Sequence, residues 1–72
     1  MLGELALLIL QHLFDRQGKR VAIADLEAVT GKDIHTLRAA IEDLKTQRLV
    51  AEDEYRIEIR PEGVSFARSR WV

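Results

Sequence analysis

The chain has 72 residues, of which 32% are charged, and its formal net charge is −1 at pH 7. A chain of this length forms a single domain, here residues 1–72, and a net charge near zero provides no general attraction to nucleic acid or to a membrane surface. The absence of cysteine excludes disulfide bonds, thiolate nucleophiles and cysteine-based zinc sites.

The first predicted element is a helix from Leu2 to about Gln17, because apolar residues recur there at helical spacing and Gly18 follows as a stop signal. Its continuous apolar run, Leu5 to Leu10, is far shorter than the ~20 apolar residues that span a bilayer. We therefore expect no membrane segment, and the absence of cysteine fits a cytoplasmic location.

This helix carries two apolar stripes, which together cover more of its circumference than the roughly 100° stripe of an ordinary surface helix. The residues of the first stripe, which we expect to face the core, are Leu2, Leu5, Ala6, Ile9 and Leu13. Those of the second stripe are Leu7, Leu10 and Phe14. The second stripe either packs beneath a C-terminal helix or forms a subunit interface. We favour the interface, because surplus apolar surface on a small domain is commonly covered by a partner.

Two helices separated by a tight turn are predicted next, after a short strand at Val21. The first helix, Ile23–Thr30, ends at Gly31, since glycine adopts a positive φ without penalty. Asp33 is a good N-cap for the second helix, which continues to Gln47, because its carboxylate accepts hydrogen bonds from free backbone N–H groups. The apolar stripe of this second helix consists of Leu37, Ala40, Ile41 and Leu44.

Two strands and a last helix complete the chain. The strands are predicted at Leu49–Ala51 and at Tyr55–Ile59, where apolar and charged residues alternate with the period of a half-buried strand. The turn that links them, at Asp53-Glu54, lacks the Gly or Asn favoured in two-residue hairpins, and this leaves a slightly longer loop open as an alternative. Pro61 suits the first position of the last helix. Phe66 points partly away from the core side of this helix. The residues expected on that side are Val64, Ala67 and Trp71.

This order of elements resembles the winged helix–turn–helix domain of bacterial transcription regulators of the MarR and PadR kind, over about Val21 to Ala67. The residues at the family's core and turn positions are Ile23, Leu26, Thr30, Gly31, Thr36, Leu37, Ile41, Leu44, Leu49 and Val50. The resemblance implies an α+β fold with a three-helix core, a small antiparallel β-wing and a C-terminal helix, and dimerisation through the terminal helices. The residues that we expect in one core are Leu26, Leu37, Ile41, Leu44 and Ile57.

The sequence departs from the family pattern at three places. Ala22 stands where the family usually has Ser or Thr, and it has no side chain that could cap a helix. Arg48 stands where glycine is frequent. The wing tip is the acidic segment Glu52–Glu54, although the family's wing is often basic, and this argues against DNA contact by the tip.

No arrangement of catalytic residues is evident. His12 and His35 lie on different predicted helices and lack the spacing of a metal pair. The pair Gly31-Lys32 lacks the spacing of a phosphate-binding loop. We therefore predict neither an enzyme nor a metal or cofactor.

The first functional hypothesis is a small homodimeric regulator that binds double-stranded DNA. Its helix Asp33–Gln47 would enter the major groove and contact DNA through its N-terminal turns. Arg38 is the best candidate to read guanine, because its guanidinium pairs with O6 and N7. The residues expected to contact DNA are Lys32, His35, Thr36, Arg38, Lys45 and Arg56. Those expected in the dimer interface are Leu7, Leu10, Phe14, Phe66 and Trp71.

The second hypothesis is a winged-helix module that binds a protein and no DNA. Duplex affinity comes largely from neutralising phosphates, but residues 31–48 carry four cations against three acids. Glu42 also lies on the face of the second helix that would meet the groove. The motif favours DNA binding, whereas the charge pattern favours the alternative.

Overall fold

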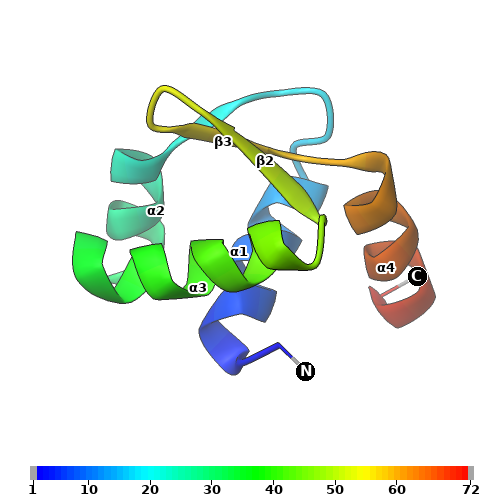
Figure 1. Cartoon of the computed structure of the whole chain (residues 1–72), viewed down its shortest axis with the longest axis horizontal. Helices are drawn as coiled ribbons and strands as arrows, with labels where there is room; N and C mark the ends of the chain where they lie inside the picture. The colour runs from blue at the N-terminus through cyan, green and yellow to red at the C-terminus, as the bar shows by residue number, and fades with distance from the viewer. Residues whose placement is uncertain (1, 72) are drawn as a thin grey trace.

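The computed structural model describes residues 2–71, which form four helices and a three-stranded antiparallel sheet. The elements follow one another in the order predicted from the sequence, and the fold belongs to the α+β class (Figure 1). Their bounds are α1 (Glu4–Phe14), β1 (Val21–Ala22), α2 (Ile23–Thr30), α3 (Ile34–Thr46), β2 (Val50–Asp53), β3 (Arg56–Ile59) and α4 (Pro61–Trp71).

The sheet has β3 in its centre, with β1 and β2 on either side, both antiparallel to it. Ile57 and Ile59 of β3 are buried and alternate with more exposed residues, as expected for a half-buried strand. Figure 1 shows the sheet along one side of the molecule, with the helices on the other. The fully buried residues of the core include all those predicted, namely Leu26, Leu37, Ile41, Leu44 and Ile57.

The ends of α2 and α3 obey the local rules that their residues predict. Gly31, directly after α2, has a φ of 72°, and the Asp33 side chain accepts a hydrogen bond from the backbone N–H of Thr36 at 2.9 Å. Ala22 precedes α2 without a side-chain cap. Arg48, just beyond α3, has a φ of 60°, which is the left-handed conformation that favours glycine after a helix.

The second apolar stripe of α1 is covered mostly by the chain itself. α1 packs against α2, α3, α4 and β3, and Leu10 is 0% exposed. The ring of Phe14 lies against Trp71 of α4, with ring centroids 6.4 Å apart. The prediction that Leu10 belongs to a subunit interface is therefore wrong, because the elements around α1 enclose it in the core. Leu7 remains half-buried.

The helix α1 is also shorter than predicted. It ends at Phe14, and residues 15–18 form a turn. In this turn the N–H of Arg16 bonds to the carbonyl of Leu13 at 3.0 Å, which tightens the chain and ends the α-helical pattern. Gly18, the predicted stop signal, has a φ of 81°, and it lies four residues beyond the last residue of α1.

The hairpin between β2 and β3 has a two-residue turn. Asp53 pairs with Arg56, so only Glu54 and Tyr55 form the turn, with φ values of 49° and 67°. Two central residues with positive φ indicate a type I′ turn, whose twist matches that of the flanking strands. The turn therefore has two residues and lies one position later than the predicted Asp53-Glu54, and Glu52 lies within β2.

The start of α4 lies close to the segment that joins α3 to β2. The carbonyl of Leu49 accepts a hydrogen bond from the N–H of Arg60 at 2.9 Å, and Gly63 is buried in the first turns of α4. A Cβ atom at Gly63 would collide with the carbonyl oxygen of Leu49 and lie 2.7 Å from Cγ1 of Ile59. The close approach of the backbones therefore requires glycine here.

Candidate nucleic-acid interface

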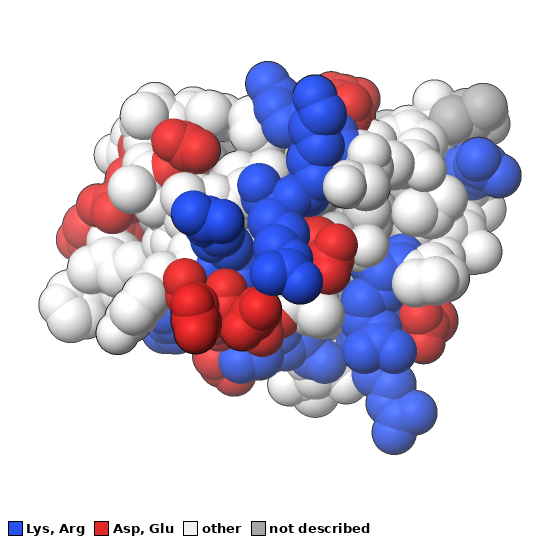
Figure 2. Space-filling model, turned by 90° about the horizontal axis from the view of Figure 1, so that it is seen from above, with Lys and Arg blue, Asp and Glu red and all other residues white. Residues whose placement is uncertain are grey.

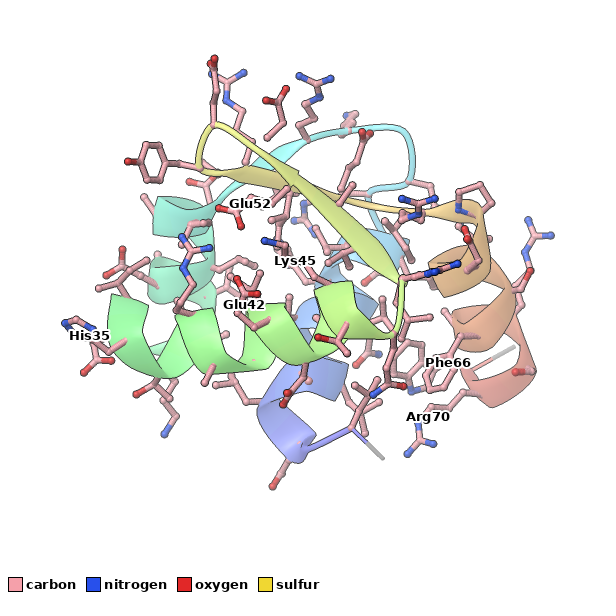
Figure 3. All side chains as sticks on the ribbon, in the orientation of Figure 1. His35, Glu42, Lys45, Glu52, Phe66 and Arg70 are labelled. Atoms are coloured by element: carbon pink, nitrogen blue, oxygen red, sulfur yellow. The ribbon has the colours of Figure 1, made fainter. Side chains whose placement is uncertain are left out.

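The first turn of α3 carries predicted DNA contacts that lie at the surface: Lys32, which just precedes the helix, His35 and Thr36. Figure 3 shows His35 at one end of α3, pointing away from the rest of the molecule. The carboxylate of Asp33 accepts the backbone N–H of Thr36 at 2.9 Å, and this hydrogen bond lowers the pKa of Asp33. The positive end of the helix is therefore partly neutralised by its own cap.

Two further predicted contacts belong to a group between α3 and β2 that we call the α3–β2 charge cluster: Arg38, Glu42, Lys45 and Glu52 (Figure 3). One carboxylate oxygen of Glu52 lies 2.7 Å from Nη1 of Arg38 and 3.1 Å from Nζ of Lys45. Oε1 of Glu42 lies 3.3 Å from Nζ of Lys45 and 3.9 Å from Nη1 of Arg38. Two cations thus face two carboxylates, and the cluster has no net charge.

The cluster results from helical spacing combined with strand register. Arg38, Glu42 and Lys45 are spaced i, i+4 and i+7, so they share one side of α3. Glu52 pairs with Ile57 in the sheet, and its side chain, which is only 15% exposed, lies on the side that faces α3. The prediction that Glu52 belongs to an exposed acidic tip is wrong, because β2 continues past Glu52 and strand alternation directs this side chain to the helix.

The contacts in the cluster hold its charged forms in place. The hydrogen bond from Arg38 lowers the pKa of the Glu52 carboxyl, and the hydrogen bonds to Glu52 raise the pKa of both Arg38 and Lys45. These three groups are therefore charged at neutral pH. A DNA phosphate that binds either cation has to compete with the Glu52 carboxylate.

Beyond its first turn, α3 carries no Lys or Arg in the exposed class, whose members there are Ala39, Glu42, Asp43 and Thr46, and its Arg38 and Lys45 are half-buried. The outer face of α3 is therefore acidic toward its C-terminal half. Arg38, the predicted guanine reader, is half-buried beside this face and is held by Glu52.

The outer face of the sheet carries side chains of both signs next to each other (Figure 2). Nη1 of Arg20, in the loop before β1, lies 3.1 Å from Oδ2 of Asp53, and its Nε lies 3.9 Å from Oε1 of Glu58. Arg56, the last predicted DNA contact, is exposed on β3 and takes part in no ion pair within residues 2–71. The sequence did not predict these ion pairs of Arg20, because they depend on the pairing of β1 with β3, which are distant from each other in the sequence.

Within residues 2–71, no three His, Asp or Glu side chains converge as they would around a metal ion. No helix in this part of the chain is long and apolar enough to traverse a bilayer. A functional interpretation therefore depends on the shape and charge of the surfaces described above. No family model, curated protein or solved structure matches the chain.

Proposed function

We propose that the chain is a winged helix–turn–helix domain that binds double-stranded DNA as a transcription regulator, with α3 in the major groove and the β2–β3 hairpin as the wing. The observation that carries this proposal is the exposed first turn of α3, which follows the tight turn at Gly31. In DNA-binding proteins of this architecture, the N-terminal residues of the second helix contact base edges. Because one fold serves many functions, the proposal depends on this site rather than on the fold.

The proposed contacts divide by distance from the helix start. His35 and Thr36 reach base edges, and Lys32 neutralises a phosphate beside them. Arg38 reads a base only when it leaves Glu52, since a bidentate contact to guanine needs the guanidinium. Arg56 approaches the DNA backbone from the wing.

The α3–β2 charge cluster then limits DNA affinity, which leads to a direct test. Replacing Glu52 by Gln removes the nearer carboxylate from Arg38 and the nearer carboxylate from Lys45, so that Glu42 alone competes with phosphates for these two cations. We expect Glu52→Gln to bind labelled duplex DNA of mixed sequence more tightly than the wild type. The dependence of log K on log salt concentration should become steeper by up to about two units, because each neutralised phosphate adds roughly 0.9.

Titration at two salt concentrations measures both quantities, and Glu58→Gln is the matched control. Glu58 lies on the outer face of the sheet, outside the cluster, so its substitution should leave the salt slope unchanged. Salt-dependent binding by the wild type with an unchanged slope in Glu52→Gln would reject the role of Glu52 and retain the DNA proposal. No salt-dependent binding by either protein would reject DNA binding itself.

A protein-binding module is the second candidate, and the lack of net charge in the cluster favours it. The outer face of α3 carries Asp43 and Glu42 in place of cations. Leu8 and Val29 are 52% and 57% exposed, and exposed apolar side chains suit contact with a protein rather than with phosphates. This candidate replaces the first if neither the wild type nor the Glu52→Gln variant binds DNA.

We also propose that two copies of the chain associate through their terminal helices. Leu7 of α1 and Phe66 of α4 are half-buried, and they line a hollow of about 330 Å³ together with Leu2, Gln47 and Arg70. Such a dimer would present two α3 helices to successive turns of the major groove. Leu10 takes no part in this interface, since its own chain buries it.

A further inference from the structure

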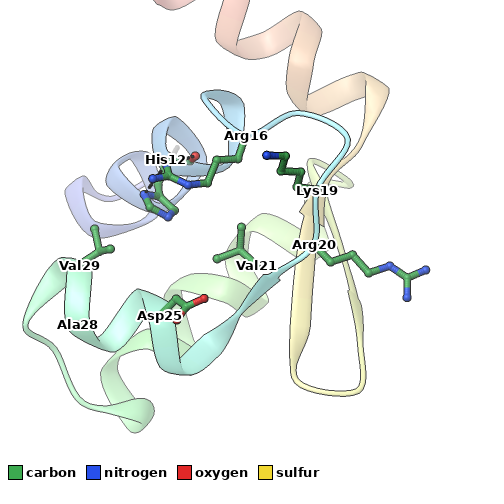
Figure 4. Close-up of a pocket in the computed structure, with 8 residues that line it drawn as sticks. All are labelled: His12, Arg16, Lys19, Arg20, Val21, Asp25, Ala28 and Val29. Atoms are coloured by element: carbon green, nitrogen blue, oxygen red, sulfur yellow. Dashed lines mark hydrogen bonds between the residues drawn. The ribbon is translucent and has the colours of Figure 1, made fainter.

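A second hollow, of about 420 Å³, lies between the C-terminal end of α1, the loop that leads to β1, and α2 (Figure 4). The charged residues that line it are Arg16 in the turn after α1, Lys19 and Arg20 in the loop, and Asp25 on α2. Figure 4 shows Lys19 pointing toward Arg16 along the rim, while Arg20 points away from the hollow. Arg20 is engaged by Asp53 at 3.1 Å, so it is not counted among the cations available to a ligand.

The charges that face this hollow do not balance. Arg16 and Lys19 take part in no ion pair within residues 2–71, and Asp25 is the one carboxylate in the lining. Two cations against one carboxylate leave an excess of one positive charge. By contrast, every cation in the α3–β2 charge cluster has a carboxylate partner. The hollow therefore attracts an anion more strongly than the cluster does.

His12 positions one of these cations without neutralising it. Nη1 of Arg16 lies 3.2 Å from Nδ1 of His12. Because a guanidinium only donates, Nδ1 is the acceptor and the ring proton resides on Nε2. Burial and then the charge of Arg16 lower the pKa of His12, so the ring is neutral at pH 7. Arg16 is thus held at the hollow with its full charge.

The remaining lining is apolar and belongs to β1 and α2: Val21, Ala28 and Val29. Val21 is 4% exposed and Val29 is 57% exposed, so the apolar surface extends from the floor of the hollow to its edge. A volume near the lower end of the roughly 300–1,000 Å³ found for ligand pockets suits a small molecule.

We propose that this hollow binds a small organic monoanion, namely a carboxylate attached to a compact apolar group. The carboxylate pairs with Arg16 and Lys19, and the apolar group rests on Val21, Ala28 and Val29. A monoanion balances the excess of one positive charge, whereas a dianion would leave the occupied hollow with a net negative charge. This proposal does not depend on DNA binding, so it survives or fails separately.

Benzoate is the probe for a titration followed by the NMR signals of the methyl groups of Val21, Ala28 and Val29. We expect saturable shifts of these signals in the millimolar range, as is typical of so small a ligand. Benzyl alcohol, which lacks the charge, and acetate, which lacks the ring, should each bind several times more weakly. Tighter binding of inorganic phosphate than of benzoate would overturn the assignment to an organic monoanion.

Three substitutions then test the roles of the charged groups, and all three affect exposed side chains. Arg16→Gln and Lys19→Gln should each weaken benzoate binding about threefold or more, because each removes a charged donor. Asp25→Asn should tighten it, because it removes a repulsive carboxylate. Arg68→Gln, on α4 and outside the hollow, is the matched control and should leave binding unchanged.

The site is supported if Asp25→Asn binds benzoate more tightly while Arg16→Gln and Lys19→Gln bind it more weakly. Unchanged affinity in Arg68→Gln would show that these effects do not come from the net charge of the protein. Equal affinities in the wild type, Arg16→Gln and Lys19→Gln would overturn it. So would the lack of any saturable shift in the wild-type protein.

Discussion

Glu52 controls the charge of the α3 surface from a neighbouring strand. It is 15% exposed, and one of its oxygens lies within 3.1 Å of both Arg38 and Lys45. Surface ion pairs usually contribute little to stability, but a shared carboxylate between two potential phosphate contacts directly affects binding. Gly63 is a second residue whose role depends on its neighbours rather than on its own chemistry, because the carbonyl of Leu49 occupies the space that a Cβ atom would need.

Replacing Gly63 by Ala should destabilise the protein, although the same change inside a helix normally stabilises it by about 0.5–1 kcal/mol. The added Cβ atom forces α4 away from Leu49, and overpacking of this kind costs roughly 1–3 kcal/mol. Denaturant unfolding monitored by circular dichroism measures the change in the free energy of unfolding.

Ser65→Ala is the control for this substitution, since Ser65 is exposed on the same helix. Its effect should stay small. A Gly63→Ala variant that is as stable as the wild type would show that α4 can move away from Leu49 without loss.

At the scale of elements, α3 has a well-capped start and a strained end. Asp33 accepts the N–H of Thr36 at 2.9 Å at the start, which is the arrangement that an N-cap residue predicts. At the end, Arg48 takes up the left-handed conformation with a φ of 60°, and its N–H bonds to the carbonyl of Lys45 at 2.9 Å. The chain must turn there so that β2 can run back along α3.

Arg48→Gly should therefore stabilise the protein by about 1 kcal/mol, because a residue with a Cβ atom pays roughly 1–2 kcal/mol in the left-handed region and glycine does not. Arg48→Ala removes the same side chain but keeps the Cβ atom, so it should not stabilise. Thermal and denaturant unfolding of the two variants compare them directly. Equal stability of the Gly and Ala variants would mean that the backbone at position 48 is not strained.

At the scale of the whole molecule, α1 is the element around which the others pack. It contacts α2, α3, α4 and β3, and this accounts for the complete burial of Leu10 and Leu13. The same packing leaves Leu7 at the edge, next to Phe66 of α4 across a shared hollow. The proposed dimer surface therefore combines residues from both ends of the chain.

Sedimentation over a micromolar to submillimolar range tests this dimer. The wild type should sediment as a dimer at the upper concentrations, and Leu7→Asp should sediment as a monomer, because a charge in an apolar interface is costly to desolvate. Leu8→Asp is the matched control, since Leu8 is already 52% exposed and does not line the hollow that Leu7 shares with Phe66. It should leave the dimer intact. A wild-type protein that remains monomeric throughout would rule out the interface.

The sequence by itself determined the order of the elements, most of the core residues, and the residues that end α2 and begin α3. Each of these follows from interactions between near neighbours: the helical spacing of Leu37, Ile41 and Leu44, the cap at Asp33, and the positive φ at Gly31. Residue spacing alone is enough to predict such features.

Only the tertiary structure decided which surfaces are free and which charges are paired. The burial of Leu10 depends on the packing around α1, and the pairing of Glu52 with Arg38 depends on where β2 ends and how it lies along α3. The hollow lined by Arg16 and Lys19 lies where the segment after α1, the loop to β1, and α2 come together. Strand register and packing bring together residues that are distant in the sequence, and local residue spacing determines neither the register nor the packing.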